Sequence, residues 1–253
     1  MYITTAPQSY IRDHRAESRP LLQYPFSGSL RNAVRRATID AGVGVRLPCR
    51  IGSRSEYGRS ALVTGDAATR LAFGGLRFLE YADLECLLII PRLARRVMAL
   101  PTPPGHRLWS AVDTPSDDYI AKANEGWFDI SSQGGLFGED REFYVPVPIR
   151  RTSENEDYWW AHVHLEDEWD VMGRGSEAIL GIASGRPAFA MLSLSGDTAV
   201  SGDVWEAQIG SVLVSGIRDV RGFREACRKE MERPKTSVFN RDAIGRWLKS
   251  VEE

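Results

Sequence analysis

Residues 158–165 read YWWAHVHL, and this mixture of aromatic and β-branched side chains predicts a β-strand. Similar runs, separated by Gly, Asp and Ser turns, predict further strands in the second half of the chain: FYVPVPI (143–149), FAMLSLS (189–195) and VWEAQIGSVLV (204–214). Helices are expected afterwards over 219–233, which ends before Pro234, and beyond Asn240 as its N-cap. Strands followed by helices, without regular alternation, favour the α+β class.

The first half of the chain is predicted to contain helices rich in arginine. The segment LECLLII (84–90) is expected to be a buried strand, and RLARRVMAL (92–100) a helix that begins after Pro91. The Pro-rich segment 101–118 is interpreted as a linker or a break within the fold. We therefore expect two modules, an N-terminal one over 1–105 and a strand-rich C-terminal one over 106–253 that carries a glycine loop and two terminal helices.

Residues 25–42, PFSGSLRNAVRRATIDAG, predict an amphipathic helix that ends at Gly42. Its apolar positions recur at helical spacing and form one buried stripe. Three arginines, Arg31, Arg35 and Arg36, occupy its first two turns. Arg31 and Arg35 are four residues apart and share a face, where their guanidinium groups could bind two adjacent phosphates.

Composition excludes several classes of protein. The chain has 253 residues, 43% hydrophobic and 26% charged, with a net charge of −2, which argues against a protein that coats nucleic acid nonspecifically. No apolar run reaches the length of a membrane span, so we expect a cytoplasmic protein without a membrane partner. Cysteines without CxxC spacing predict no zinc site. Only four of the 32 basic residues are lysines, and this arginine bias suits phosphate and base contacts, although a GC-rich genome would produce it equally well.

Residues 173–183, GRGSEAILGIA, read G-x-G-x5-G-x-A. This loop resembles the glycine-rich loop of the RAMP superfamily, the ferredoxin-like CRISPR proteins that bind and process guide RNA; Gly173, Gly175 and Gly181 match the family pattern, whereas Ala183 replaces its last glycine. The helix at 25–42 resembles the P-x-S-S-L-R-G-A-L-R helix of many members. It retains the following residues: Pro25, Ser29, Leu30, Arg31, Ala33 and Arg35.

The resemblance implies ferredoxin-like (RRM-like) antiparallel sheet modules and a guide-RNA-binding subunit of a CRISPR ribonucleoprotein. Its partners would be the guide RNA, or its repeat hairpin, and other subunits. The expected RNA-binding residues are Arg31, Arg35, Arg36, Gly173, Arg174, Gly175 and Gly181, with Tyr57 or Tyr81 available for stacking on bases.

The resemblance also implies metal-independent cleavage of precursor RNA, for which no cofactor is expected. Nucleases of the family often use a histidine from the region after the first strand. Here the first strand is predicted over MYITTAP (1–7), and the region after it is SYIRDHRAESR (9–19). His14 would be the base and Tyr10 a helper, and Arg12 or Arg31 would bind the phosphate.

Two alternatives belong to other functional classes. His162 and His164 alternate on the strand at 158–165 and point the same way, so together with Glu166 they could bind zinc or manganese in a metal-dependent hydrolase or nuclease. A noncatalytic module is the other alternative, in which Trp159, Trp160 and Trp169 would form a protein interface.

Overall fold

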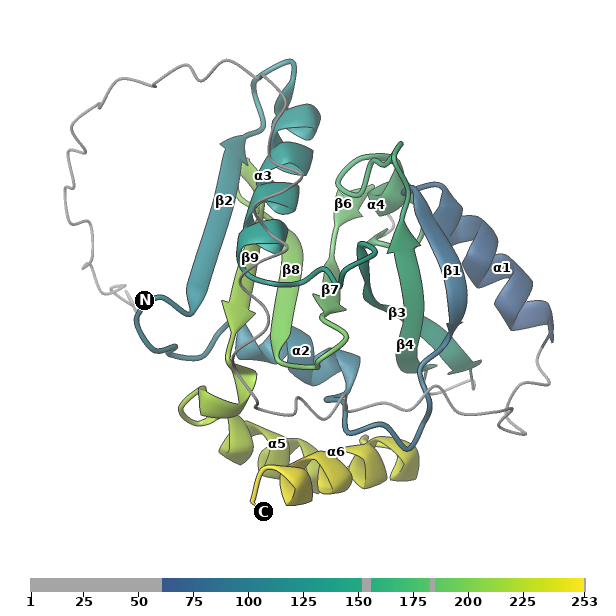
Figure 1. The fold of residues 1–253 in the computed structure, drawn as a ribbon, viewed down its shortest axis with the longest axis vertical. Coiled ribbons are helices and arrows are strands. Elements are labelled where there is room, and N and C mark those ends of the chain that lie inside the picture. The colour runs from purple at the N-terminus through teal and green to yellow at the C-terminus, as the bar shows by residue number, and fades with distance from the viewer. Residues whose placement is uncertain (1–60, 152–155, 183–184, 253) are drawn as a thin grey trace, which may run out of the picture. The chain divides into compact units, whose positions relative to one another are not determined.

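The computed structural model describes residues 61–252 except 152–155 and 183–184, and it is an α+β structure (Figure 1). A seven-stranded sheet has the order β1-β4-β3-β7-β8-β9-β2, and its paired strands are antiparallel. The elements are α1 (Ala61–Ala72), β1 (Leu76–Tyr81), α2 (Pro91–Val97), β2 (Arg107–Asp113), α3 (Tyr119–Gln133), β3 (Glu142–Arg151), β4 (Glu156–Leu165), α4 (Arg174–Ala178), β5 (Gly181–Ile182), β6 (Arg186–Pro187), β7 (Phe189–Leu192), β8 (Thr198–Trp205), β9 (Gln208–Ser215), the 3-10 turn η3 (Ile217–Asp219), α5 (Phe223–Glu232) and α6 (Val238–Ser250).

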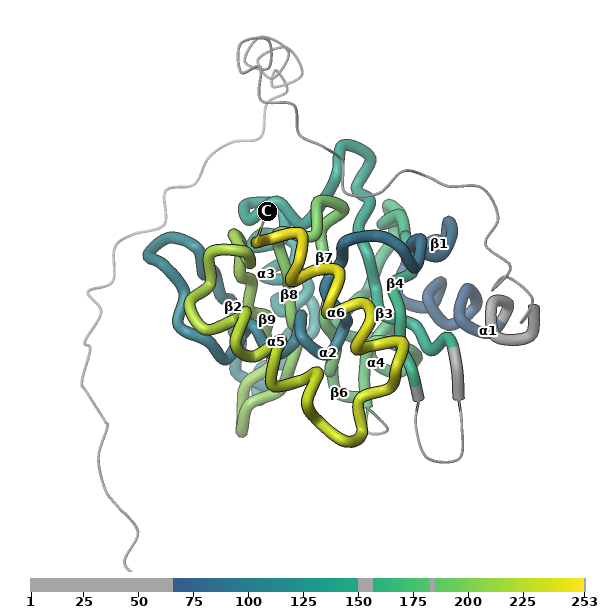
Figure 2. The backbone as a smooth tube through the Cα atoms, turned by 90° about the horizontal axis from the view of Figure 1, so that it is seen from below, coloured from purple at the N-terminus to yellow at the C-terminus, as the bar shows by residue number. Residues whose placement is uncertain are grey.

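Helices lie on both faces of the sheet, and each strand supplies side chains to both sides because they alternate along it. On β4, Ala161 and Val163 point into a core shared with α1 and α3, whereas Trp160 points into a second core shared with α2, α5 and α6. Figure 1 shows α3 alongside β2 and β9, and Figure 2 shows α6 and α5 crossing in front of the strands. The sheet is therefore the middle layer between two apolar cores.

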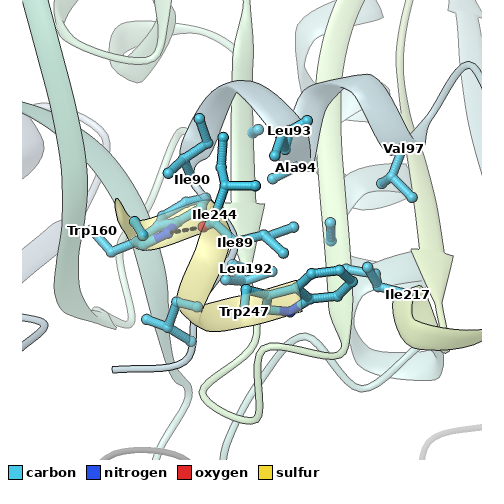
Figure 3. Close-up of a cluster of buried hydrophobic side chains, with 14 of the residues drawn as sticks. Ile89, Ile90, Leu93, Ala94, Val97, Trp160, Leu192, Ile217, Ile244 and Trp247 are labelled. Carbon is cyan, nitrogen blue, oxygen red and sulfur yellow. Dashed lines mark hydrogen bonds between the residues drawn. The ribbon is translucent and has the colours of Figure 1, made fainter. Parts of the chain in front are cut away.

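The second core explains why residues 84–90 do not form the predicted strand. Ile89 and Ile90 are buried beside α2 and α6, as the sequence suggests, but among the described residues their segment pairs with no strand. The Trp160 indole instead donates a hydrogen bond of 2.6 Å to the Ile89 carbonyl (Figure 3). A side chain thus satisfies a backbone group that a strand would bond in a ladder.

The predicted strand at 204–214 is two strands. β8 ends at Trp205 and β9 begins at Gln208, and Glu206 in the turn between them has a φ of 47°. Trp205 and Gln208 are paired across this hairpin. The aromatic and β-branched composition therefore identified strand residues but not the reversal of the chain.

The predicted linker at 101–118 contains β2, which pairs with β9 over all of Arg107–Asp113. The predicted boundary after residue 105 also crosses the sheet, because β1 pairs with β4.

Three helices match predicted ones: 91–97, 223–232 and 238–250. The last helix is capped by Ser237 rather than Asn240, because the Ser237 side chain accepts a hydrogen bond from the Asn240 amide. None of the helices in the described part has both the length and the apolar character needed to cross a bilayer.

Candidate functional site

The glycine loop binds an anionic group of the protein itself. Asp170 lies just before the loop, and its two carboxylate oxygens accept hydrogen bonds from the amides of Gly173 (2.9 Å) and Arg174 (3.0 Å). Asn124 of α3 donates to the same carboxylate at 2.7 Å. These are the amides that would approach a phosphate, so a carboxylate already occupies the position that the sequence assigned to RNA.

These contacts determine the charge state of Asp170. Burial alone would raise the pKa of this carboxyl, but hydrogen bonds from Arg174, Asn124 and Gly173 outweigh it and lower the pKa below 3.8. The Arg174 guanidinium, 3.5 Å from the carboxylate, acts in the same direction. Asp170 is thus a stably ionised cap of the loop.

The other loop glycines permit close packing of the backbone. A Cβ on Gly175 would lie 3.2 Å from the Gly74 Cα and 3.0 Å from a methyl group of Leu180, and one on Gly181 would lie 1.9 Å from the Ser176 carbonyl oxygen. Glycine is therefore required at Gly181, whereas a side chain at Gly175 would make its neighbours shift by a few tenths of an ångström.

Several predicted site residues lie outside the described residues. These are Tyr10, Arg12, His14, Arg31, Arg35, Arg36 and Tyr57. Tyr81, the other predicted stacking residue, is partly buried and makes an edge-to-face contact with Phe78.

The two strand histidines do share one face of β4, as predicted. His162 Nε2 lies 3.0 Å from Glu142 Oε2 on β3, and Nδ1 lies 3.7 Å from Glu80 Oε1 on β1. The Tyr144 ring packs 5.6 Å from the imidazole. His162 therefore bridges three adjacent strands through polar contacts.

The predicted metal ligands are not brought together. Glu166 forms a 2.6 Å ion pair with Arg77 rather than facing His162. Within residues 61–252, leaving aside the undescribed gaps, no group of three or more His, Cys, Asp or Glu side chains is arranged to hold a metal ion. His162 is thus paired with Glu80 and Glu142, and Glu166 with Arg77, in separate polar contacts.

Two of the three tryptophans expected at an interface are core residues, and the third, Trp169, is partly buried. Trp159 and Trp160 are fully buried, and the indole nitrogen of Trp159 donates to the Ala82 carbonyl. Trp169 stacks on Phe128 and packs against Trp127. Trp159 and Trp160 therefore present no surface to a partner, and Trp169 is largely used by its aromatic neighbours.

Two other tryptophans are exposed on one face of the sheet. Trp109 on β2 is 70% exposed, and Trp205 at the end of β8 is 39% exposed. Trp109 pairs with Val212 of β9, and Val212 pairs with Ser201 of β8. Ser201 and Trp205 are four positions apart on β8 and share a face, so the register places both tryptophans on the same side of the sheet.

Small residues separate the two tryptophans. Between the row of Trp109 and the row of Trp205 lies a third row, in which Gly210 is flanked by Ala111 and Asp203. We call the surface formed by these three rows the open sheet face; its residues are Trp109, Ala111, Asp113, Ser201, Asp203, Trp205, Gln208, Gly210 and Val212. Short side chains in its middle row leave both aromatic rings accessible.

Arginines border the open sheet face. Arg95 of α2 reaches onto it and donates to Asp203 at 2.8 Å, and the neighbouring Arg96 is exposed. Arg107, on the same side of β2 as Trp109, donates to the carbonyls of Met98 and Leu100 just beyond α2. The face thus combines exposed aromatic rings with guanidinium groups.

The sequence carried one signal for this face that its interpretation missed. RLWSAVD alternates so that Leu108, Ser110 and Val112 point toward α3 and Trp109 points away. The flanking Pro and Gly residues led instead to the prediction of a linker.

No known protein family, curated protein or solved structure matches the chain at a significant level.

Proposed function

We propose that this protein binds single-stranded RNA on the open sheet face. The observation that carries the proposal is the exposure of Trp109 and Trp205 on one side of the sheet. Aromatic side chains on a sheet surface are platforms on which unpaired bases stack. An exposed tryptophan also keeps apolar area in water unless a ligand covers it.

The bordering arginines supply phosphate contacts. An RNA strand can stack one base on Trp109 and another on Trp205. Between the two rings it passes over Ala111 and Gly210, where no large side chain stands in the way. Arg95 of α2 stands beside that path, where it bonds Asp203, and Arg107 lies on the same side of β2 as Trp109. Their guanidinium groups bind backbone oxygens, which makes the affinity dependent on salt.

The proposal extends to a guide RNA within a CRISPR ribonucleoprotein, which is the function implied by the resemblance of residues 25–42 and 173–183 to the RAMP superfamily. In it, Arg31, Arg35 and Arg36 contact the RNA backbone, and His14, with Tyr10 and Arg12, carries out metal-independent processing of the precursor. Because Asp170 occupies the amides of the glycine loop that were expected to bind phosphate, the open sheet face replaces that loop as the proposed RNA-binding surface.

Fluorescence anisotropy with a labelled single-stranded RNA tests the proposal. Loss of one stacked base corresponds to about 1–3 kcal/mol, so Trp109→Ala and Trp205→Ala should each weaken binding roughly five- to 150-fold. Phe73→Ala is the matched control, because Phe73 is 56% exposed directly after α1 and outside the open sheet face.

The same assay separates stacking from charge. A duplex RNA of equal length should bind more weakly, because its bases are not available to the indole rings. Equal affinities of wild type and both tryptophan variants would remove the open sheet face from RNA binding.

A further inference from the structure

β2 is an edge strand of the sheet formed by the described residues. It is the last strand in the sheet order and pairs with β9 alone among the described residues. The pairing runs from Arg107 to Asp113 without a bulge. Edge strands present unpaired backbone groups that can bond another strand.

The hydrogen-bond pattern identifies which backbone groups face outward. The Ser215 amide donates to the His106 carbonyl, and the Thr114 amide donates to the Ala207 carbonyl, so even-numbered residues of this segment bond to β9. In an antiparallel pair, bonded and non-bonded residues alternate. The N–H and C=O groups of the odd-numbered residues therefore face away from β9; they belong to Arg107, Trp109, Ala111 and Asp113.

The sequence of β2 is complementary to itself when reversed. If two copies of RLWSAVD pair antiparallel about Ser110, Arg107 faces Asp113, Leu108 faces Val112 and Trp109 faces Ala111. Opposite charges meet at both ends, and a large side chain meets a small one beside the centre. This register pairs odd-numbered residues with odd-numbered ones, which are the residues whose backbone groups face outward.

The end groups retain bonding capacity for these contacts. Arg107 uses Nη2 for the carbonyls of Met98 and Leu100, and Asp113 uses Oδ1 for the Gln208 amide. In the described part of the chain, Arg107 Nη1 and Asp113 Oδ2 have no hydrogen bond of their own. Both side chains are exposed, so an ion pair between copies can form at each end of the strand.

β1, the strand at the opposite edge of the sheet, has features that hinder pairing with a strand of another molecule, and β2 lacks them. β1 has a register irregularity between Phe78 and Glu80, and its Arg77 and Glu80 make charged contacts with neighbouring strands. β2 contains no proline, glycine, lysine or bulge, which are the devices that natural edge strands use against association. Its regular, exposed edge is therefore suited to a specific neighbour.

The side of β2 nearest α3 is also accessible. A groove of about 450 Å³ lies between Leu108 and Ser110 of the strand and Gly126, Ile130 and Gln133 of α3. An incoming strand along β2 would place its own Leu and Val side chains on this side, because they alternate with Trp and Ala. In the register about Ser110 the incoming Val112 lies opposite Leu108, which lines this groove, so the groove leaves space for that valine.

We infer that two copies of this chain form a twofold-symmetric dimer in which their β2 strands pair antiparallel about Ser110, joining the two sheets into one. Each of the four odd-numbered pairs exchanges two N–H···O bonds. Such an interface is isologous, so it closes after two copies and does not propagate into a filament. The dimer brings the two Trp109 side chains onto one continuous sheet face.

Analytical ultracentrifugation of the full-length protein, freed of nucleic acid, tests the dimer. Wild type is expected to sediment as a dimer at micromolar concentration. Arg107→Asp places two acidic groups opposite each other at both ends and should raise the dimer dissociation constant at least about tenfold. Asp113→Arg should do the same through opposed arginines, and the double variant Arg107→Asp/Asp113→Arg should restore the dimer.

Ala111→Pro gives a second test through the backbone. It removes an N–H that faces away from β9, so the protomer should keep its circular dichroism spectrum while the dimer dissociates. Trp205→Ala is the matched control and should remain dimeric. A monomeric wild type, a dimer unaffected by Ala111→Pro, or a double charge variant no better than the single ones would each overturn the inference. RNA binding is scored separately, so its failure leaves these results unchanged.

Discussion

Arg95 of α2 donates a 2.8 Å hydrogen bond to Asp203 of β8, which places a guanidinium group over the row between Trp109 and Trp205. The pair is partly exposed, with 46% and 35% of the two side chains accessible. An ion pair of this kind contributes little to stability. The ion pair instead affects the charge of the open sheet face, because Asp203 both orients Arg95 and offsets its positive charge.

Neutralising Asp203 should strengthen RNA binding. Asp203→Asn keeps an oxygen that accepts from Arg95 but removes the negative charge that repels phosphate. We expect the dissociation constant for single-stranded RNA to fall roughly two- to fivefold, and the melting temperature to change little. The control is Asp66→Asn on α1, where another aspartate lies 3.8 Å from an arginine, Arg70. Equal effects of the two substitutions would show that the site of the charge does not matter.

Asp170 should stabilise the fold near neutral pH. Asp170→Ala leaves the amides of Gly173 and Arg174 and the side chain of Asn124 without their acceptor. The expected loss is about 1–3 kcal/mol in the free energy of unfolding, measured in urea at pH 7. RNA binding by folded protein should be unchanged, and a specific loss of RNA affinity would return the glycine loop to the binding surface.

The contribution of Asp170 should also depend on pH. Its pKa is lower in the folded protein than the ordinary value of 3.8, so the unfolded chain takes up a proton first as the pH falls. The stabilisation is complete above about pH 4 and is lost as the pH falls through the folded pKa. Urea unfolding of wild type and Asp170→Ala should therefore converge in acid, and a constant difference would contradict the assigned ionisation.

The loop glycines should be needed for folding. Gly181→Ala puts a methyl group 1.9 Å from the Ser176 carbonyl oxygen, and we expect destabilisation of more than about 2 kcal/mol by thermal or urea unfolding. The matched control is Gly245→Ala on α6, where the new methyl group would meet only a Met231 methyl at 3.8 Å. That helical substitution should be neutral or stabilising by about 0.5–1 kcal/mol.

Tyr144 should make the protein sensitive to alkali. Its burial, followed by the charges of Glu80 and Glu142, raises the pKa of the phenol from 10.0 to about 12. The unfolded chain then loses this proton first, so stability falls as the pH rises from about 10 toward about 12. Tyr144→Phe should reduce that fall by about 2–3 kcal/mol. Urea midpoints across this range test it, and identical slopes would contradict the raised pKa.

Aromatic and β-branched runs predicted much of the sheet, because strands that face a core on one or both sides need such residues. The strands at 143–149 and 158–165 are confirmed within β3 and β4. The strand predicted over 84–90 is not formed, and there a side chain distant in sequence bonds the backbone: the Trp160 indole donates to the Ile89 carbonyl. The apolar pattern of residues 84–90 cannot predict a hydrogen bond from a residue 71 positions after Ile89 in the chain.

The open sheet face was missed for a different reason. Proline and glycine around residues 107–113 indicate loops, and β2 is short and exposed on one side. The glycine pattern at 173–183 was visible, but its function depends on whether an anion already binds the amides. The anion is Asp170, three residues before Gly173, whose carboxylate accepts from the Gly173 amide. An aspartate at this spacing is typical of a side chain that bonds nearby backbone amides.

Photo-crosslinking with mass spectrometry tests the central claim most directly. Wild-type protein is irradiated in complex with a single-stranded RNA, digested, and searched for peptides that carry a nucleotide. Peptides crosslinked at Trp109 and Trp205, and lost in the corresponding alanine variants, are the predicted result. Bound RNA that crosslinks only to other parts of the chain, or the absence of RNA binding, would contradict the assignment of the open sheet face.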